Sequence, residues 1–460
     1  MLVRALLFIA PKKIKVADTA KTVKRRHLHQ LSRSSPREIL RSWRTAAEME
    51  PSEHVAALFY LGRAVRGRSA SDSFQQWCLH DDAQRWLHHN PDFAALLKAI
   101  HGVAPKLAPK NLARVLLALS DTHEDFPFVY PELSPAHAQL VLSVVDVSCE
   151  QLRTAWQGQT NILDDRDLAF PLVALARLGV YIEDIFDMAC QRLTRMFGAS
   201  GRMPATAFRQ WLSSCNSVNH SLSSCEGVIT NYLEHEWACS DHGRLHQLAG
   251  ALVFLESPEP LLSQVIREIN ARPISQIKDS RAVSLYGLQA VRLLTASGHL
   301  ETEARFDHGV VQQLDYWLEE KARRLRRHSL LEYAVGNALT QCGFEPVHDV
   351  AVGYGLSADF QCTYNGRLFH VEVDGPSHFC VRPAGRPRGR TVLKQRLLSA
   401  CGLEFVSVPY WVVSPPNICA RLRKDQKLPE VDKFNAYVLD RLGVRQSSAA
   451  DPQTTSLGMG

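Results

Sequence analysis

The sequence predicts a mainly α-helical protein, in which an array of helix pairs precedes a small C-terminal α/β domain. Two observations indicate this division. Apolar residues at helical spacing fill the chain from residue 36 to 300, whereas strand-like alternation is concentrated between residues 358 and 409. The 460 residues suffice for two or three domains, and 45% hydrophobic with 22% charged residues is typical of a globular protein.

Residues 1–35 differ in composition from the rest and are expected to lie outside the fold. They are rich in Arg, Lys and Ser, and Asp18 is their one acidic residue. Such a composition is typical of an organelle transit peptide, or alternatively of a basic tail. A transit peptide predicts the mitochondrial matrix, with a plastid as the alternative. No run reaches the roughly 18 apolar residues that a membrane span needs.

Residues 36–300 are predicted to form a helical repeat domain. Five apolar segments rich in small residues resemble one another, and each is followed by a second helical pattern. They begin at Asn111, Arg166, Thr206, Gly243 and Arg281. The last four starts lie 40, 37 and 38 residues apart, a period typical of α-solenoids. We therefore predict a solenoid-like array, with an irregular helical bundle as the alternative.

Charge and cysteine content narrow the classes of function. The net charge is +6, and the basic residues cluster near the N-terminus and in the last third. This distribution favours a polyanionic partner such as nucleic acid, although a solvated charged surface has the same composition. The eleven cysteines form no C-x-x-C and no pair at zinc spacing with histidines. We therefore expect reduced thiols and no zinc module.

Residues 301–328 are predicted to form a basic connecting helix, which ends in the sequence KARRLRRH. Arginines at this density suit contacts with phosphate groups. They also suit the C-terminal end of a helix dipole, so the alternative is a purely structural role. The candidate RNA-binding residues of this helix are Arg323, Arg324, Arg326 and Arg327.

Residues 329–430 are predicted to form a small α/β domain with a mixed sheet. Asn365-Gly366 is a two-residue turn signal between the strands Ala358–Tyr364 and Arg367–Asp374. A helix over residues 392–401 and a buried strand over residues 403–408 follow. Residues 431–460 are expected to form a C-terminal helix and a disordered tail.

The hairpin predicts a group of carboxylates. Counting back from the turn places Asp359 opposite Glu372, with Asp374 on the same face of the sheet. Opposed carboxylates repel each other, so a divalent cation, nearby basic groups or a shared proton must offset the repulsion. The three carboxylates suit Mg²⁺ and phosphodiester hydrolysis. Neutralisation by Lys394 and Arg396, or by His378, would involve no catalysis.

The region from Leu368 to Trp411 resembles the RAP domain of organelle RNA-binding proteins, a family found in apicomplexans, algae and plants and in the animal FAST-kinase-domain proteins. The matching residues are Glu372, Val373, Asp374, Gly375, Pro376, His378, Phe379, Gly389, Thr391, Leu393, Lys394, Arg396, Leu398, Val408, Pro409, Tyr410 and Trp411. The family is similar in fold to restriction-endonuclease-like nucleases. In those, the positions that match Asp359 and Glu372 bind metal.

The resemblance implies an organelle RNA-binding protein, most simply mitochondrial. It would act in RNA processing or stability, or as an rRNA-binding component or assembly factor of the mitochondrial ribosome. The expected partners are organelle rRNA or transcripts and other ribonucleoprotein or mitoribosome proteins, and no membrane. The RNA-binding candidates in the terminal domain are Arg382, Arg386, Arg388, Arg390, Lys394, Arg396 and Tyr410. For Phe379 and Trp411 we expect packing in the core.

Two alternatives remain open. The first is a metal-dependent endoribonuclease with Asp359, Glu372 and Asp374 as its carboxylates and His378 as general acid or base. In related nucleases a lysine usually stands where this chain has Asp374, which weighs against the standard mechanism. Only this alternative requires a cofactor, Mg²⁺, with Asp359 and Glu372 as its ligands. The second alternative is a protein scaffold within a ribonucleoprotein.

Overall fold

The computed structural model describes most of the chain from residue 34 to residue 443. The described residues are 34–46, 49–65, 86–123, 135–158, 165–200, 205–222, 225, 227, 229–230, 232, 242–254, 259–271, 285–323, 329–413 and 431–443. Residues 1–33 of the predicted transit peptide and the predicted disordered tail therefore lie outside the described residues. The predicted domain boundaries stay predictions.

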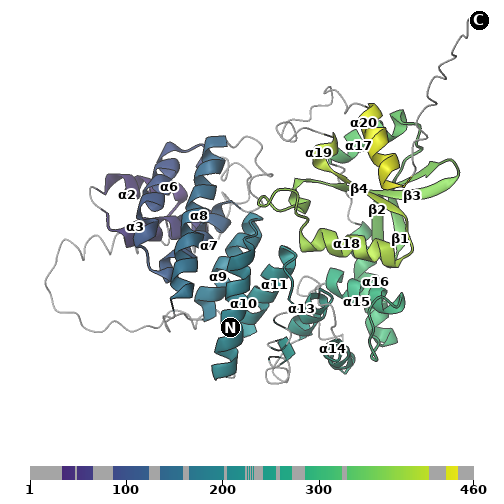
Figure 1. The fold of residues 1–460 in the computed structure, drawn as a ribbon, viewed down its shortest axis with the longest axis horizontal. Helices are drawn as coiled ribbons and strands as arrows, with labels where there is room; N and C mark the ends of the chain where they lie inside the picture. The colour runs from purple at the N-terminus through teal and green to yellow at the C-terminus, as the bar shows by residue number, and fades with distance from the viewer. Residues whose placement is uncertain are drawn as a thin grey trace, which may run out of the picture.

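The chain is mainly helical and ends in a small four-stranded sheet region, so the predicted fold class is confirmed (Figure 1). The helices before the sheet are α2 (Pro36–Thr45), α3 (Pro51–Val65), α6 (Pro91–Val103), η2 (Ala104–Lys106), α7 (Pro109–Thr122), α8 (Pro135–Gln157), α9 (Asp165–Leu178), α10 (Glu183–Ser200), α11 (Ala205–Ser217), α13 (His242–Leu252), α14 (Leu261–Asn270), α15 (Leu285–Ala296), α16 (His308–Arg323) and α17 (Leu330–Gln341). In the described part of the chain, no helix has both the length and the apolar character for crossing a membrane.

The helices before the sheet stack in two rows, as in a solenoid. In one row α3, α7, α9, α11, α13 and α15 each pack on the next, and in the other α6 packs on α8 and α8 on α10. The five segments predicted as repeat starts form α7, α9, α11, α13 and α15. Small residues permit the close contacts, since a Cβ atom on Gly62 of α3 would lie 2.9 Å from the carbonyl oxygen of Ala118 in α7.

The terminal sheet has the strand order β1-β2-β3-β4, formed by Val347–Gly353, Leu356–Tyr364, Arg367–Asp374 and Phe405–Pro409. β2 and β3 are antiparallel, and Tyr364 pairs with Arg367 as the turn predicted. β4 lies parallel to β3, so the predicted mixed sheet is confirmed. β1, which pairs with β2, was not predicted from the sequence.

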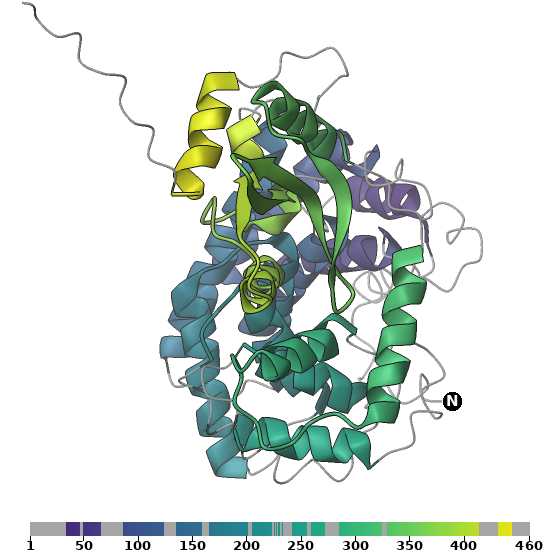
Figure 2. The ribbon, with the colours of Figure 1, turned by 90° about the vertical axis from the view of Figure 1, so that its right-hand side faces the viewer.

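Two hydrophobic cores meet at this sheet. The apolar face, with Phe360, Phe369 and Val371, packs with α17, α19 (Tyr410–Val413) and α20 (Val431–Arg441) in one core. The other face is covered by α18 (Gly389–Ala400), which Figure 2 shows end-on between the sheet and the helical array. Leu393 and Leu397 of α18 belong to the core of the array rather than to that of the sheet. The helix α18 therefore joins the two parts of the chain.

Candidate functional site

The predicted carboxylates lie in the layer between the sheet and α18. Glu372 and Asp374 are only 2% and 3% exposed at the end of β3. The register of β2 and β3 ends at Phe360 opposite Val371, so Asp359 and Glu372 follow at the end of the paired region, and Asp359 Oδ2 accepts a hydrogen bond of 2.7 Å from the Val373 N–H. The group is thus built as the hairpin predicted.

Basic and hydroxyl groups neutralise these carboxylates. The Lys394 ammonium of α18 forms an ion pair with Oε2 of Glu372. Oδ1 of Asp374 lies 2.6 Å from Nδ1 of His378. The other carboxylate oxygen, Oδ2, accepts a hydrogen bond from the Ser407 hydroxyl. Lys394 and His378 therefore offset part of the repulsion that the sequence predicted between these carboxylates.

Burial dominates the electrostatics of the group. Desolvation raises the pKa of Glu372 to about 8, although Lys394 opposes the shift, and the nearby Asp359 adds to it. Desolvation also raises the pKa of Asp359, again against the effect of Lys394. A perturbed carboxyl group of this kind occurs both in active sites and in structural ion pairs.

Asp359 and Glu372 offer the oxygen donors that Mg²⁺ prefers. Oε1 of Glu372 is buried without a hydrogen-bond partner, which is consistent with a further ligand there. Lys394, however, already places a positive charge on the other carboxylate oxygen. The residues therefore fit a divalent cation only in competition with this ammonium group.

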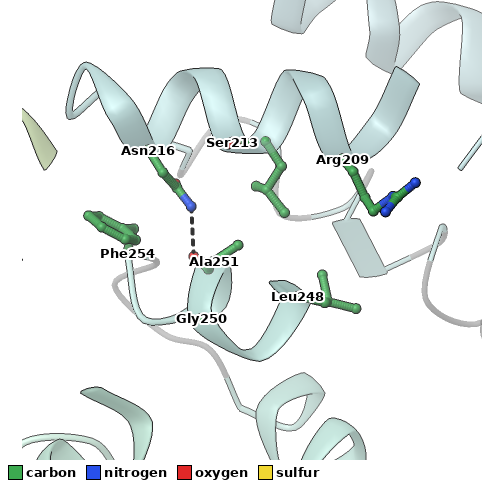
Figure 3. A pocket seen from close by; sticks show the side chains of 8 residues that line it. Arg209, Ser213, Asn216, Leu248, Gly250, Ala251 and Phe254 are labelled. Atoms are coloured by element: carbon green, nitrogen blue, oxygen red, sulfur yellow. Dashed lines mark hydrogen bonds between the residues drawn. The ribbon is translucent and has the colours of Figure 1, made fainter. Parts of the chain in front are cut away.

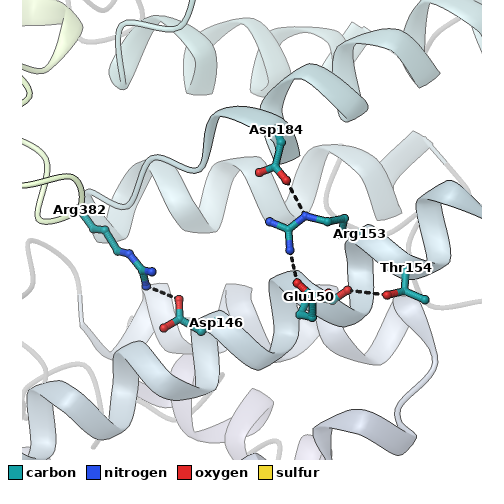
Figure 4. Close-up of polar contacts among 6 residues, drawn as sticks. All are labelled: Asp146, Glu150, Arg153, Thr154, Asp184 and Arg382. Carbon is teal, nitrogen blue, oxygen red and sulfur yellow. Dashed lines mark hydrogen bonds and ion pairs between the residues drawn. The ribbon is translucent and has the colours of Figure 1, made fainter.

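The predicted RNA-binding arginines of the loop after β3 contact the helical array instead of lying free. Arg382 forms an ion pair with Asp146 of α8 (Figure 4). The backbone adds to this contact, since the Tyr181 N–H donates to the Arg382 carbonyl and the Val381 N–H to the Gly179 carbonyl, each at 2.7 Å. The loop is thus docked on the turn between α9 and α10.

Arg386 makes the most extensive of these contacts. Its guanidinium donates to the carbonyl oxygens of Val218 and Asn219, at 3.2 and 2.8 Å, in the turn after α11. The same group lies 3.8 Å from the centre of the Tyr181 ring, which is a cation–π contact. The guanidinium group of Arg386 therefore already makes, within the protein, the stacking contact and the hydrogen bonds that it would need for binding RNA.

The remaining basic candidates of this domain differ in their surroundings. Arg396 donates to the Val253 carbonyl after α13 at 2.8 Å, and Arg388 donates to the Phe379 carbonyl at 3.2 Å. Arg390 is exposed on the first turn of α18. Their RNA-binding role stays a prediction, and the structure gives Arg382, Arg386 and Arg396 a docking role that the sequence did not indicate.

A pocket between α11 and α13 adjoins this docked surface. Figure 3 shows Asn216, Ala251 and Phe254 at one end of it, and the Asn216 side chain donates to the Ala251 carbonyl at 3.4 Å. Gly389 at the start of α18 lies against the same end, because a Cβ atom there would meet the Asn216 carbonyl oxygen at 1.7 Å. The pocket is therefore bordered by the docked α18.

The basic connecting helix is described only in part. Arg323 ends α16, and Arg324, Arg326 and Arg327 lie outside the described residues. Their predicted contact with RNA stays a prediction.

The aromatic residues that follow β4 form a cluster at the surface. Phe379 is buried, as expected, and its ring centre lies 4.5 Å from that of Trp411. Tyr410 packs on Trp411 at 5.0 Å. Trp411 is 39% exposed, so the expectation of core packing was wrong for this residue. The sequence Pro409-Tyr410-Trp411 did not indicate this exposure. β4 ends at Pro409 and α19 begins at Tyr410, and the change from strand to helix leaves the Trp411 indole partly exposed.

Comparison with known families supports the assignment of this region. The family model of the RAP domain matches residues 371–415, which include Glu372, Lys394 and Trp411. No curated protein shows a significant match to the chain. The chain therefore contains a RAP domain, an RNA-binding domain, as its sequence predicted. Its relation to apicomplexan or FAST-kinase-domain proteins stays a prediction.

Proposed function

We propose that this protein binds organelle RNA, through the surface of its RAP domain around Trp411. It would act in a mitochondrion, in RNA processing or stability or as an rRNA-binding factor of the mitochondrial ribosome. The observation that carries the proposal is the exposed Trp411 within a matched RAP domain. The basic, acid-poor first 35 residues support the mitochondrial location.

Trp411 has the properties of a stacking platform. Phe379 and Tyr410 hold its ring from the protein side, while its exposed part is open to a nucleotide base. Unstacked bases of single-stranded RNA bind aromatic rings in this way. The segment that follows α19 carries Arg421, Arg423, Lys424 and Lys427, which supply positive charge for phosphates.

Replacement of Trp411 tests the proposal. We expect Trp411→Ala to weaken binding of single-stranded RNA by about 1–3 kcal/mol, the range for one stacked base. The control is Tyr333→Ala, since Tyr333 is 59% exposed on α17 of the same domain but lies outside the aromatic cluster. Fluorescence anisotropy at several salt concentrations gives both affinities. Equal affinity of the two variants, or no RNA affinity even at low salt, would overturn the proposal.

The RNA partner and the compartment need separate measurements. Crosslinking and sequencing of RNA bound to the native protein would distinguish rRNA from messenger or precursor transcripts. Imaging of the full chain with a C-terminal fluorescent tag, with and without residues 1–35, would test the mitochondrial location. Recovery of ribonucleoprotein partners without any crosslinked RNA would favour the scaffold alternative.

Metal-dependent RNA cleavage is the second candidate, because Oε1 of the buried Glu372 has no hydrogen-bond partner. It predicts cleavage in the presence of Mg²⁺ or Mn²⁺ that is lost in Glu372→Ala and in Asp374→Ala. Gel analysis of RNA incubated with each purified variant measures this. Cleavage that persists in both variants would trace to a contaminant and exclude the carboxylate mechanism.

A further inference from the structure

A compact group of thiols and one imidazole lies inside the helical array. It consists of Cys190 on α10, Cys215 on α11 and His220 in the turn that follows α11. All three residues are buried, and their ligand atoms lie within 4.8 Å of one another. Among the described residues no other three His, Cys, Asp or Glu side chains meet in this way. Cys225, also buried, interacts with Cys190 but lies outside the group whose ligand atoms are all within 4.8 Å of one another.

The geometry resembles that of a tetrahedral metal site. Cys190 Sγ lies 3.7 Å from His220 Nε2. Zinc bonds of about 2.3 Å to sulfur and about 2.0–2.1 Å to nitrogen place tetrahedral ligands roughly 3.5–3.8 Å apart. The group itself offers two thiols and one imidazole, and the Cys225 thiol beside Cys190 would complete a donor set typical of structural zinc sites.

Neighbouring groups orient the potential ligands. The second ring nitrogen of His220, Nδ1, lies 3.1 Å from the Tyr181 hydroxyl, while Nε2 faces Cys190 Sγ and also lies 3.6 Å from Oδ1 of Asp187. This matches the arrangement in which a ligand histidine donates its other N–H to a partner. The Trp211 indole N–H donates to Cys190 Sγ at 3.3 Å. Such a donor stabilises negative charge on a ligating sulfur.

Burial also holds the imidazole in the form that ligates. Desolvation lowers the pKa of His220, against the effect of Asp187, so the ring stays neutral near pH 7. Hydrogen bonding to Cys215 together with burial raises the pKa of Cys190, so this thiol keeps its proton in the absence of metal. Each thiol that ligates a metal releases one proton to solvent, and a divalent cation compensates two of the three thiolate charges.

We propose that Cys190, Cys215 and His220 hold a structural zinc ion, with Cys225 as the fourth ligand. The ion would join α10, α11 and the chain after α11. That chain includes Val218 and Asn219, whose carbonyls receive Arg386, and Tyr181 contacts both Arg386 and His220. The metal would thus fix the surface on which the RAP domain docks.

The spacing of these residues explains why the sequence did not predict the site. Cys190 and Cys215 lie on different helices, 25 positions apart, and no C-x-x-C marks them. Zinc-site motifs rely on ligands that are close in sequence. Here the packing of α10 and α11 with the following turn brings the ligands together.

Metal content of the full chain tests the proposal directly. The protein is produced with supplied zinc, purified under reducing conditions and analysed by mass spectrometry of its metals. We expect close to one zinc per chain, retained in Cys149→Ser and lost in Cys215→Ser and His220→Ala. Cys149 is a matched control, because it is a buried thiol on α8 outside the group.

Cobalt substitution covers the case in which a ligand variant fails to fold, since it needs only the wild-type chain. Co²⁺ bound by thiolates gives a charge-transfer band and visible bands of tetrahedral type, and added Zn²⁺ should abolish both. Three results would overturn the proposal: wild-type chain without zinc, freely alkylated Cys190 and Cys215 in the presence of zinc, or a Cys190–Cys215 disulfide in protein kept reduced.

Discussion

Glu372 shows how a single buried residue carries several roles at once. It is 2% exposed, paired with Lys394 and close to two further carboxylates. A buried ion pair of this kind gives little net stability, but removal of one partner leaves an uncompensated charge. The residue is therefore best tested by a change that keeps its shape and removes only its titration.

We expect the contribution of Glu372 to the stability of the chain to fall as pH rises from about 4.5 to about 8. Glu372 keeps its proton in the folded chain up to a pKa of about 8, whereas the ordinary value is 4.5. In this interval the folded state binds more protons than the unfolded state, so rising pH favours unfolding. Each pH unit across the interval is worth up to about 1.4 kcal/mol.

Urea unfolding at a series of pH values measures this effect. Glu372→Gln should make the slope of stability against pH more positive between about pH 4.5 and about pH 8, and Glu345→Gln, at an exposed position, should leave the slope unchanged. An equal slope in wild type and Glu372→Gln would mean that Glu372 is not the group responsible.

Gly389 is the residue at which the docking of the RAP domain is tightest. A Cβ atom there would lie 1.7 Å from the backbone oxygen of Asn216, so the backbone of α11 or α18 would have to move. We expect Gly389→Ala to destabilise the chain by about 1–3 kcal/mol, the usual cost of overpacking. Gly375→Ala is the control, because a Cβ atom at Gly375 meets nothing within 4 Å. Thermal unfolding gives the melting temperature of each variant, and we expect that of Gly389→Ala to be lower. Equal melting temperatures would contradict the docked arrangement.

At the scale of elements, the loop after β3 acts as a docking segment. Arg386 reaches the turn after α11 and Arg396 of α18 reaches the turn after α13, while Arg382 forms an ion pair with Asp146 of α8. The carbonyl groups at helix C-termini carry partial negative charge, which attracts a guanidinium. The basic composition of this loop is thus explained in part without a nucleic acid.

We expect Arg386→Lys to loosen the docked loop, because an ammonium cannot stack on Tyr181 and bond two carbonyls at once. The expected loss is about 1–3 kcal/mol in the free energy of unfolding. Hydrogen exchange should rise at Val381 and Tyr181, whose amides bond across the contact. The exposed Arg390→Lys serves as control, and unchanged exchange in Arg386→Lys would refute the docking role.

The elements that the sequence predicted are those governed by local rules. The Asn-Gly turn set the register of β2 and β3, and the repeat period located α9, α11, α13 and α15. The partners of Arg382 and Arg386 were not predictable, because Asp146 and Val218 are more than 160 residues away in sequence. The exposure of Trp411 likewise depends on where α19 begins, which no local pattern fixed.

At the scale of the whole molecule, α18 makes the two hydrophobic cores depend on each other. Its Leu393 and Leu397 pack into the core of the array, while its Lys394 neutralises Glu372 of the sheet. The RAP domain is therefore packed against the helical array through α18, and RNA bound near Trp411 would be held in a fixed position relative to the array.

This dependence predicts that the array and the sheet unfold together in wild type. Leu397→Ala should cost about 2–5 kcal/mol, the range for a buried leucine, and should separate the two unfolding transitions. Val438→Ala on α20, which is buried in the core of the sheet alone, is the matched control and should lower stability without separating them. Hydrogen exchange followed by mass spectrometry can monitor α13 and β3 separately during denaturant unfolding. Two separate transitions in wild type would show that α18 does not couple the cores, whereas a single transition that splits only in Leu397→Ala assigns the coupling to this helix.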